Sequence, residues 1–345
     1  MSTPNLFQPT QIGDIQLAHR VVMAPATRYH VDDAHTPVPL VGEYYEQRAS
    51  TLGSLLISEA TLIAQRAAVG AVSSLVSLAH PRRRLRTEYT RRTLSCSSNS
   101  GQLVGLLKLI YWQRRISPAS SPQAYLSPGG PKPRPLTVEE IKEFTELYAQ
   151  AAINAVQRAG FDGVEIHSAN GYLIDQSLHP GSNLRTDAYG GSIENRVRFA
   201  PEVTEAVVKA VGQKKTAFRT SPWGTWQEMH FDDPLPTYAH LVTELRHRYP
   251  NFAYIHAVKP RANGGGHGSE PFISGGGYNR ASAIAVAGEK GDLKRNYDLP
   301  DLPYRLIRDI ALTVGDRALY CVPGSVEPKG YTDYAFASPV VPVHA

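Results

Sequence analysis

The stretch Gly160–Arg198, GFDGVEIHSANGYLIDQSLHPGSNLRTDAYGGSIENRVR, decides the fold because it places polar groups directly after a buried strand. The run Val164–Ile166 predicts that strand, and His167, Asn170 and Tyr172 follow it closely. An imidazole and a carboxamide can both donate to one developing oxyanion, and a phenol nearby can act as an acid. We therefore predict these three residues to be catalytic, with His167 and Asn170 also binding the substrate.

Each of these side chains also has a structural interpretation. A single histidine at a strand end is more often a core residue with a satisfied hydrogen bond than a catalytic group. Asn170 and Tyr172 stand so close to His167 that the catalytic interpretation is the better one.

The length and composition favour one large domain. The chain has 345 residues, of which 42% are hydrophobic, and a TIM (β/α)8 barrel is among the few folds that use such a length as a single domain. No apolar run approaches the ~20 residues of a membrane span, and the amino terminus lacks a basic-then-apolar signal pattern. We therefore expect a cytoplasmic protein that does not contact membranes. Cys96 and Cys321 lack the spacing of a zinc site or a disulfide framework, so we expect reduced thiols and no metal.

Strands alternate with helices along the chain, which is typical of a parallel sheet closed as a barrel. The clearest helix is 137–159, because Thr137 can cap it, Glu140 completes a capping box and Gly160 can end it. The same alternation predicts further strands at 20–25, 54–60, 215–222, 252–258 and 272–277, and helices at 192–211, 238–248 and 281–290.

Residues 68–125 break this alternation. They are rich in Ser and Arg, carry a net charge of +8 against −3 for the rest of the chain, and show no convincing strand. One hypothesis is a frame-shifted segment, since Ser95–Gly105 can be back-translated in another frame to LQLQLWAVGR, and Leu85–Arg92 to a sequence like TDRVHAK. The alternative is a genuine divergent loop. The charge does not form the interleaved basic and aromatic surface of a nucleic-acid binder, so we expect no nucleic-acid partner.

The motifs HSANGYLIDQ and SNLRTDAYGGSIENR resemble the Old Yellow Enzyme family of FMN-dependent ene-reductases, in its fungal-type members. Back-translated residues 95–105 resemble the family's third strand. In pieces, the resemblance covers residues 5–67, 127–260 and 270–336. It implies a TIM barrel over residues 1–345, irregular or damaged in its strand 3 and strand 8 regions, with FMN as cofactor and NADPH as reductant.

The resemblance also assigns site residues. Thr27 would donate to the flavin C4=O, and Arg219 would hold the negative charge of the reduced ring near N1 and C2=O. As structural alternatives, Thr27 is a turn hydroxyl and Arg219 a member of an ion pair. The full set of FMN-binding residues implied is Pro25, Ala26, Thr27, Ala60, His167, Arg219, Gly276, Gly277 and Arg295.

Two positions depart from the family pattern. Where relatives carry a Gly-Arg pair for the flavin phosphate after strand eight, this chain has Lys294 and Arg295, and lysine cannot give the close backbone approach of glycine. Near the carboxyl end, Cys321 replaces a substrate-lining tyrosine, so we expect Tyr320, directly before it, to line the substrate.

The function implied is reduction of the activated C=C bond of an enone or enal, in a secondary-metabolite pathway. His167 and Asn170 would bind the carbonyl oxygen, and Tyr172 would protonate the α-carbon. Two alternatives stay open. One is a catalytically impaired relative that binds FMN poorly or not at all, and the other is a basic RNA- or partner-binding protein built around Arg82–Arg92.

Overall fold

The structure is a computed structural model that describes residues 3–31, 37–64, 104–110, 116–117, 134–225, 229–258, 272–275, 279–290, 293–296, 299–312, 316–320, 322 and 325–337. Within this part of the chain, no helix is long and apolar enough to span a bilayer. Cys96, Cys321 and the basic run Arg82–Arg92 lie outside it.

The core of the fold is a closed barrel of parallel strands, in the spatial order β10-β11-β12-β3-β4-β5-β8-β9. This arrangement matches the predicted (β/α)8 barrel. Because the strands are parallel, all their carboxyl ends open at the same end of the barrel. The strands are β3 Val21–Met23, β4 Leu55–Leu62, β5 Val104–Ile110, β8 Gly163–Ser168, β9 Thr216–Thr220, β10 Tyr254–Val258, β11 Phe272–Gly275 and β12 Leu293–Asn296.

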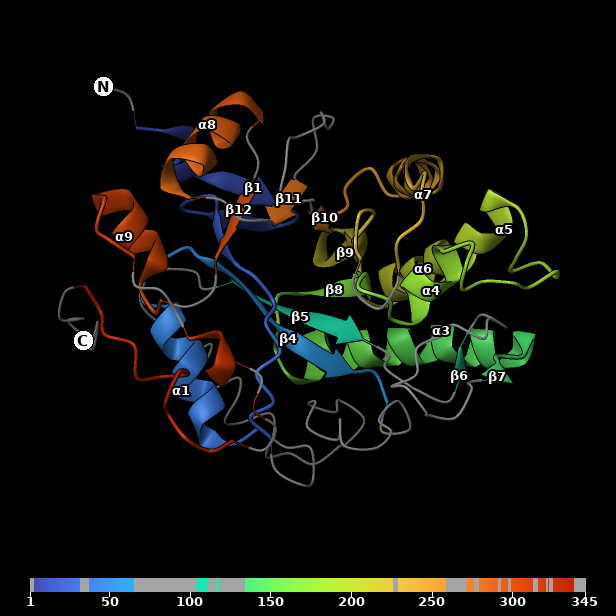
Figure 1. Cartoon of the computed structure of the whole chain (residues 1–345), viewed down its shortest axis with the longest axis horizontal. Coiled ribbons are helices and arrows are strands. Elements are labelled where there is room, and N and C mark those ends of the chain that lie inside the picture. The colour runs from blue at the N-terminus through green and yellow to red at the C-terminus, as the bar shows by residue number, and fades with distance from the viewer. Residues whose placement is uncertain are drawn as a thin grey trace.

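Helices cover the barrel from outside, with α3 to α7 on one side and α1, α8 and α9 on the other (Figure 1). They are α1 Pro39–Arg48, α3 Val138–Ile153, α4 Leu173–Leu178, α5 Ile193–Val197, α6 Phe199–Val211, α7 Leu235–Arg248, α8 Arg280–Lys290 and α9 Leu302–Arg308. A π-helical turn, Asn154–Arg158, extends α3, and short 3₁₀ turns occur at Asn5–Phe7, Gln213–Lys215 and Arg317–Leu319. Phe144 and Tyr148 of α3 are buried in one cluster with Phe199 of α6 and Phe218 of β9.

A hairpin closes the amino-terminal end of the barrel. It consists of β1 Thr10–Ile12 and β2 Ile15–Leu17, which pair antiparallel. Ile12 and Leu17 are buried against Leu55 and Tyr254, the first residues of β4 and β10. The hairpin therefore packs on the strand beginnings, and the carboxyl ends are left for a site. A second small sheet pairs β6 Ile116–Ser117 with β7 Arg134–Pro135.

The expectation of no strand within residues 68–125 was wrong, because β5 lies there and pairs with both β4 and β8. Its sequence, VGLLKLI, is largely apolar without alternation, as is typical of strands in parallel sheets. The surrounding Ser- and Arg-rich sequence concealed this signal. For the rest of the segment, the frame-shift hypothesis and its alternative, a divergent loop, stay predictions.

The eighth strand of the barrel is short and charged. Lys294 and Arg295 lie inside β12, where Lys294 pairs with Ser274 of β11 and Arg295 with Val22 of β3. Pairing on both sides overrides the weak strand propensity of LKRN, since tertiary context dominates strand formation. Arg295 therefore lies within the strand, whereas the family's phosphate-binding pair follows it. The Arg295 side chain is outside the described part of the structure.

The predicted helix 192–211 is two helices. Ser192 caps α5, where its side chain accepts from the Asn195 N–H, and α6 begins directly after Arg198. The capping box predicted at Thr137 and Glu140 is confirmed at the start of α3.

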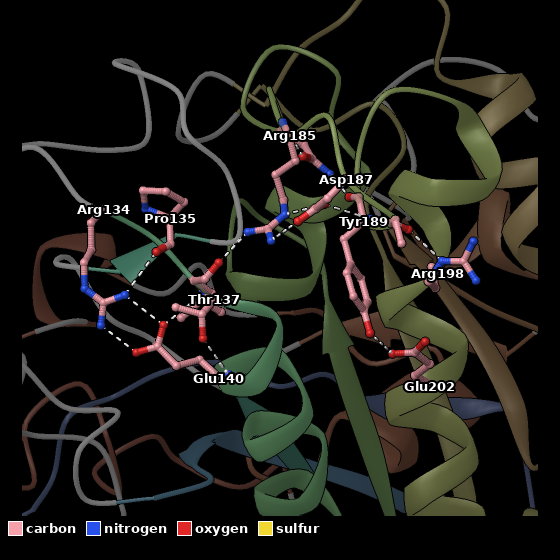
Figure 2. A network of polar contacts seen from close by, with 12 residues as sticks. Arg134, Pro135, Thr137, Glu140, Arg185, Asp187, Tyr189, Arg198 and Glu202 are labelled. Carbon is pink, nitrogen blue, oxygen red and sulfur yellow. Dashed lines mark hydrogen bonds and ion pairs between the residues drawn. The ribbon is translucent and has the colours of Figure 1, made fainter.

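The motif SNLRTDAYGGSIENR ties the loop after α4 to two helices, as Figure 2 shows. Arg185 bonds Asp187 and the carbonyl of Leu136, just before α3. The Tyr189 hydroxyl donates to Glu202 of α6 at 2.9 Å. The motif SNLRTDAYGGSIENR thus holds the outer helices α3 and α6 together, and its role here is structural.

Candidate active site

Three neighbouring strands place polar side chains at one level of the barrel. His167 of β8 is in register with Arg219 of β9, and Arg219 is in register with His256 of β10. Residues in register on neighbouring strands point to the same face of the sheet. All three are buried, with exposed fractions of 0%, 3% and 0%.

One layer below, a carboxylate spans three strands. Glu165 is in register with Ala217, which is in register with Tyr254. Because Ala217 is small, the Glu165 side chain reaches across β9, and its Oε2 lies 2.9 Å from the Tyr254 hydroxyl and 2.8 Å from Nδ1 of His256. Burial, followed by the charge of Glu165, raises the pKa of Tyr254, so this phenol keeps its proton and donates.

Arg219 lies above this carboxylate. Burial lowers the pKa of the guanidinium, and the negative charge of Glu165 acts in the opposite direction. A buried cation is tolerated where an opposite charge offsets its desolvation. Glu165 therefore helps to keep Arg219 positively charged inside the barrel.

The predicted catalytic residues continue from β8 into a tight turn. Asn170 and Gly171 both have left-handed backbones, with φ of 60° and 73°, and for a residue with a side chain this conformation costs about 1 kcal/mol. The turn brings the Tyr172 ring back to His167, with 4.9 Å between ring centroids. Tyr172 is also close enough to influence the pKa of Arg219. The structure thus brings together His167, Tyr172 and Arg219, with Asn170 in the turn between them.

The loop after β3 carries Pro25, Ala26 and Thr27, of which Pro25 is buried and the other two are partly exposed. The next two backbone N–H groups, of Arg28 and Tyr29, donate to Glu59 Oε2 at 3.1 and 3.3 Å. The Glu59 carboxylate therefore holds the loop after β3 in place through these two hydrogen bonds.

Glu59 reaches that loop because β4 is irregular. The register between β4 and β5 shifts between Ile57 and Ala60, so that β4 carries an extra residue there. Such bulges commonly redirect a side chain beside an active site. Ala60, predicted to contact FMN, follows directly and is 3% exposed.

Arg28 joins the loop to the carboxyl-terminal segment. Its guanidinium donates to the carbonyls of Tyr320 and Gly330, and lies 4.9 Å from the ring centroids of both Tyr320 and Tyr331. Tyr320, predicted to line the substrate, is therefore fixed beside the β3 loop.

Sequence reasoning missed four residues that organise this region, namely Arg28, Glu59, Asp175 and Ser221. A charged residue at a buried position of a strand is a signal that could have identified Glu59. Arg28 directly follows the predicted Thr27 and offered a similar hint. Nothing in the local pattern connected Ser221 to the turn at Asn170, because the two are 51 residues apart.

The donors in the barrel fit the ring of FMN. Arg219 is buried, and within the described part of the chain its Nε and Nη1 have no hydrogen-bond partner. Buried donors of this kind normally have an acceptor, and the flavin N1 and C2=O are acceptors that take negative charge on reduction. For the phosphate, Gly276 and Gly277 lie outside the described residues. No group of His, Cys, Asp and Glu in the described part could hold a metal ion.

Comparisons with known proteins agree with this geometry. A model of the NADH:flavin oxidoreductase / NADH oxidase family matches residues 5–75 and 113–293. The solved Old Yellow Enzyme from Pichia sp. AKU4542 superposes with a TM-score of 0.82 and 27% identity, covering 99% of this chain and 96% of that one.

Three curated fungal proteins are similar over nearly their whole length. The chanoclavine-I aldehyde reductase of Penicillium roqueforti is 39% identical, with 96% of both chains covered. An "NADP-dependent oxidoreductase" of Aspergillus flavus is 37% identical, with 97% of both covered. A "Probable inactive reductase" of Epichloe festucae var. lolii is 35% identical, with 98% of this chain and 96% of the relative covered. With the family model matching more than half of it, the chain belongs to the NADH:flavin oxidoreductase / NADH oxidase family, and its fold is that of the Old Yellow Enzymes.

Proposed function

We propose that this protein is an FMN-dependent reductase of activated C=C bonds, with NADPH as the reductant. The observation that carries the proposal is the meeting of His167, Tyr172 and the buried guanidinium of Arg219 at one end of the barrel. Arg219 and Thr27 would hold the ring of FMN, with Pro25, Ala26 and Ala60 against it. FMN, when bound and reduced by NADPH, supplies a hydride.

The chain's own residues would prepare the substrate for that hydride. His167 and Asn170 bind the carbonyl oxygen of an α,β-unsaturated aldehyde or ketone, which draws electron density away from the β-carbon. Removal of one such donor costs about 3 kcal/mol of transition-state stabilisation. Tyr172 then gives its proton to the α-carbon. With an ordinary pKa of about 10, a phenol still holds that proton at neutral pH.

The names of the relatives support a small carbonyl substrate and NADPH. Three similar fungal proteins are named as aldehyde reductases, of chanoclavine-I in two cases, and another is named NADP-dependent. We therefore propose an enal or enone of fungal secondary metabolism as the substrate, and a cytoplasmic location. Tyr320, fixed by Arg28, would line the substrate.

A second candidate is a relative that no longer turns over. Several similar proteins are named probable inactive reductases or dehydrogenases, and Lys294 and Arg295 stand within the eighth strand in place of the Gly-Arg pair that follows this strand in the family pattern. Weak phosphate binding would follow from that substitution, since lysine blocks the close approach of a phosphate to the backbone.

The colour of the purified protein separates the two candidates. A yellow protein that bleaches with NADPH, and recovers its colour when cyclohex-2-enone is added without oxygen, supports the reductase. A colourless protein that gains no flavin signal on titration with FMN contradicts it and supports the inactive relative. Retention on RNA that salt abolishes, without flavin, would support the basic binding protein instead.

Tyr172→Phe tests the assignment of the proton donor. Recovery of the flavin colour with the enone should slow by about a hundredfold, while bleaching by NADPH keeps nearly its original rate. Tyr304→Phe, an exposed tyrosine on α9, is the matched control. Equal slowing of both steps would show that Tyr172 is not the proton donor.

A further inference from the structure

A second buried carboxylate stands beside the active-site turn and has no part in the chemistry proposed above. Asp175 belongs to α4 and is 1% exposed. Its Oδ2 accepts the Gly171 N–H at 2.8 Å, and its Oδ1 accepts the Tyr238 hydroxyl at 2.8 Å. Tyr238 lies on α7, so the carboxylate links the turn to an outer helix.

A hydroxyl extends this link to the next residue of the turn. Ser221, directly after β9, accepts the Asn170 N–H at 2.8 Å, and the same Oγ lies 3.4 Å from Asp175 Oδ2. Since the Ser221 oxygen accepts from Asn170, its proton is available to Asp175. Two consecutive backbone N–H groups, those of Asn170 and Gly171, are thus fixed by one carboxylate, one directly and one through Ser221.

The turn needs such a restraint. Asn170 and Gly171 are left-handed, and strained backbones persist only where the surroundings determine them. The side chain of Gln176 adds a hydrogen bond to the Gly171 carbonyl at 2.7 Å. The orientations of the Asn170 carboxamide and the Tyr172 phenol both depend on this backbone.

We propose that Asp175 is the positioning residue of the active-site turn, which it holds through the Gly171 N–H and the Ser221 hydroxyl so that Asn170 and Tyr172 face the substrate. The inference rests on the proposed function, because it assumes that Asn170 and Tyr172 act on a bound enone. A purely structural role, as a cap of the short helix α4, is the alternative that the experiment must separate from it.

Two substitutions of Asp175 remove its hydrogen-bond acceptors to different extents. Asp175→Leu removes every acceptor, whereas Asp175→Asn keeps one carbonyl oxygen for the Gly171 N–H. Ser177→Ala is the control, since the buried hydroxyl of Ser177 belongs to the same helix and donates to a carbonyl of that helix, Ile174 O, at 2.6 Å. In the flavin-loaded protein, Asp175→Leu should slow single-turnover reduction of cyclohex-2-enone by about a hundredfold, the loss expected for a misplacement near 1 Å. Asp175→Asn should recover at least tenfold of this, and bleaching by NADPH should change by less than about threefold in both.

A second readout needs neither flavin nor turnover. Labelling with ¹³C-carbonyl asparagine and ¹⁵N-glycine selects the glycines that follow asparagine, which in this chain are Gly171 and Gly264. The Gly171 amide proton should shift upfield and exchange with solvent at least about tenfold faster in Asp175→Leu, with Asp175→Asn between this variant and the wild type, and Ser177→Ala unchanged.

The two readouts keep the outcomes distinct. If the wild type binds no flavin, the proposed function fails, while the amide signal still decides whether Asp175 holds the turn. An unchanged Gly171 amide in Asp175→Leu overturns the inference. So does an equal loss in the Asn and Leu variants of both enone reduction and bleaching, because that pattern is the one a structural cap alone would give.

Discussion

Oε2 of Glu165 lies 2.8 Å from Nδ1 of His256 although a whole strand separates them, because β9 contributes only Ala217 at that level. The carboxylate is completely buried and lies one layer below Arg219. A buried negative charge at this place reduces the positive potential that Arg219 presents to whatever binds above it. Glu165 therefore regulates how strongly the barrel favours an anionic ligand.

Glu165→Gln should raise the midpoint potential of bound FMN. The amide keeps an oxygen for Tyr254 and His256 but removes the negative charge, so the reduced flavin, which carries negative charge near N1, becomes more stable. If the ratio of the affinities for reduced and oxidised FMN changes tenfold, the midpoint potential of this two-electron couple shifts by about 30 mV. Spectroscopic titration against a reference dye measures the potential.

Two further variants should change the midpoint potential in the opposite direction or leave it unchanged. Arg219→Gln should lower the potential and weaken FMN binding, because it removes the cation itself. Glu244→Gln, on the outer helix α7, should leave the potential unchanged. A fall in potential in Glu165→Gln would contradict the electrostatic argument.

Glu59→Ala should loosen the β3 loop. It removes the acceptor of the Arg28 and Tyr29 N–H groups, and a buried donor left without a partner costs about 1–3 kcal/mol. We expect a lower free energy of unfolding in urea, and weaker FMN binding because Thr27 precedes the released groups.

Glu59→Gln is the discriminating control. Burial raises the pKa of Glu59, and the two backbone hydrogen bonds lower it, so the charge itself adds little and an amide oxygen should serve nearly as well. If the Gln variant lost as much FMN affinity as the Ala variant, the charge and not the acceptor would hold the loop.

The barrel and the position of the candidate site at the strand ends could be predicted from the sequence, since each prediction required only local information. Strand ends identified His167 and Arg219, and the capping residues identified the start of α3. The roles of the positioning residues were missed. Glu59 and Ser221 act on loops that belong to other strands. Asp175 acts on the turn just before its own helix, four residues away, where no recognised motif marks it. Strand β5 was hidden by its surroundings, and β12 by its charged residues, which only pairing on both sides explains.

The stability of the protein should depend on the protonation of Asp175. Burial, the largest effect, raises its pKa from 3.8 to about 6, against the hydrogen bonds from Gly171, Tyr238 and Ser221. The folded protein thus takes up a proton between pH 6 and 4 that the unfolded chain does not. This contribution to stability is fully present below pH 3.8 and is lost as the pH rises through 6, a difference of about 3 kcal/mol.

The comparison with Asp175→Asn isolates that group. The free energy of unfolding of the wild type, minus that of the variant, should increase as the pH falls from 7 to 4. Urea unfolding at intervals across this range measures it. A difference that stays constant with pH would show that Asp175 titrates near its ordinary pKa.

The capping box of α3 gives a prediction about stability alone. Thr137 Oγ1 accepts the Glu140 N–H at 3.2 Å, and Glu140 Oε2 accepts the Thr137 N–H at 2.8 Å. Figure 2 shows this pair beside Arg134, which also bonds Glu140. Thr137→Ala should lower the free energy of unfolding by about 1 kcal/mol, and Thr137→Ser by much less.

Thr145→Ala is the control within the same helix. The Thr145 hydroxyl bonds the Ile141 carbonyl at 3.0 Å, inside α3, and alanine favours a helix interior more than threonine does. The free energy of unfolding should therefore hold or rise in this variant. Since α3 only supports the barrel from outside, neither substitution should alter FMN binding, and a loss of FMN from Thr137→Ala would mean that the helix start is coupled to the site.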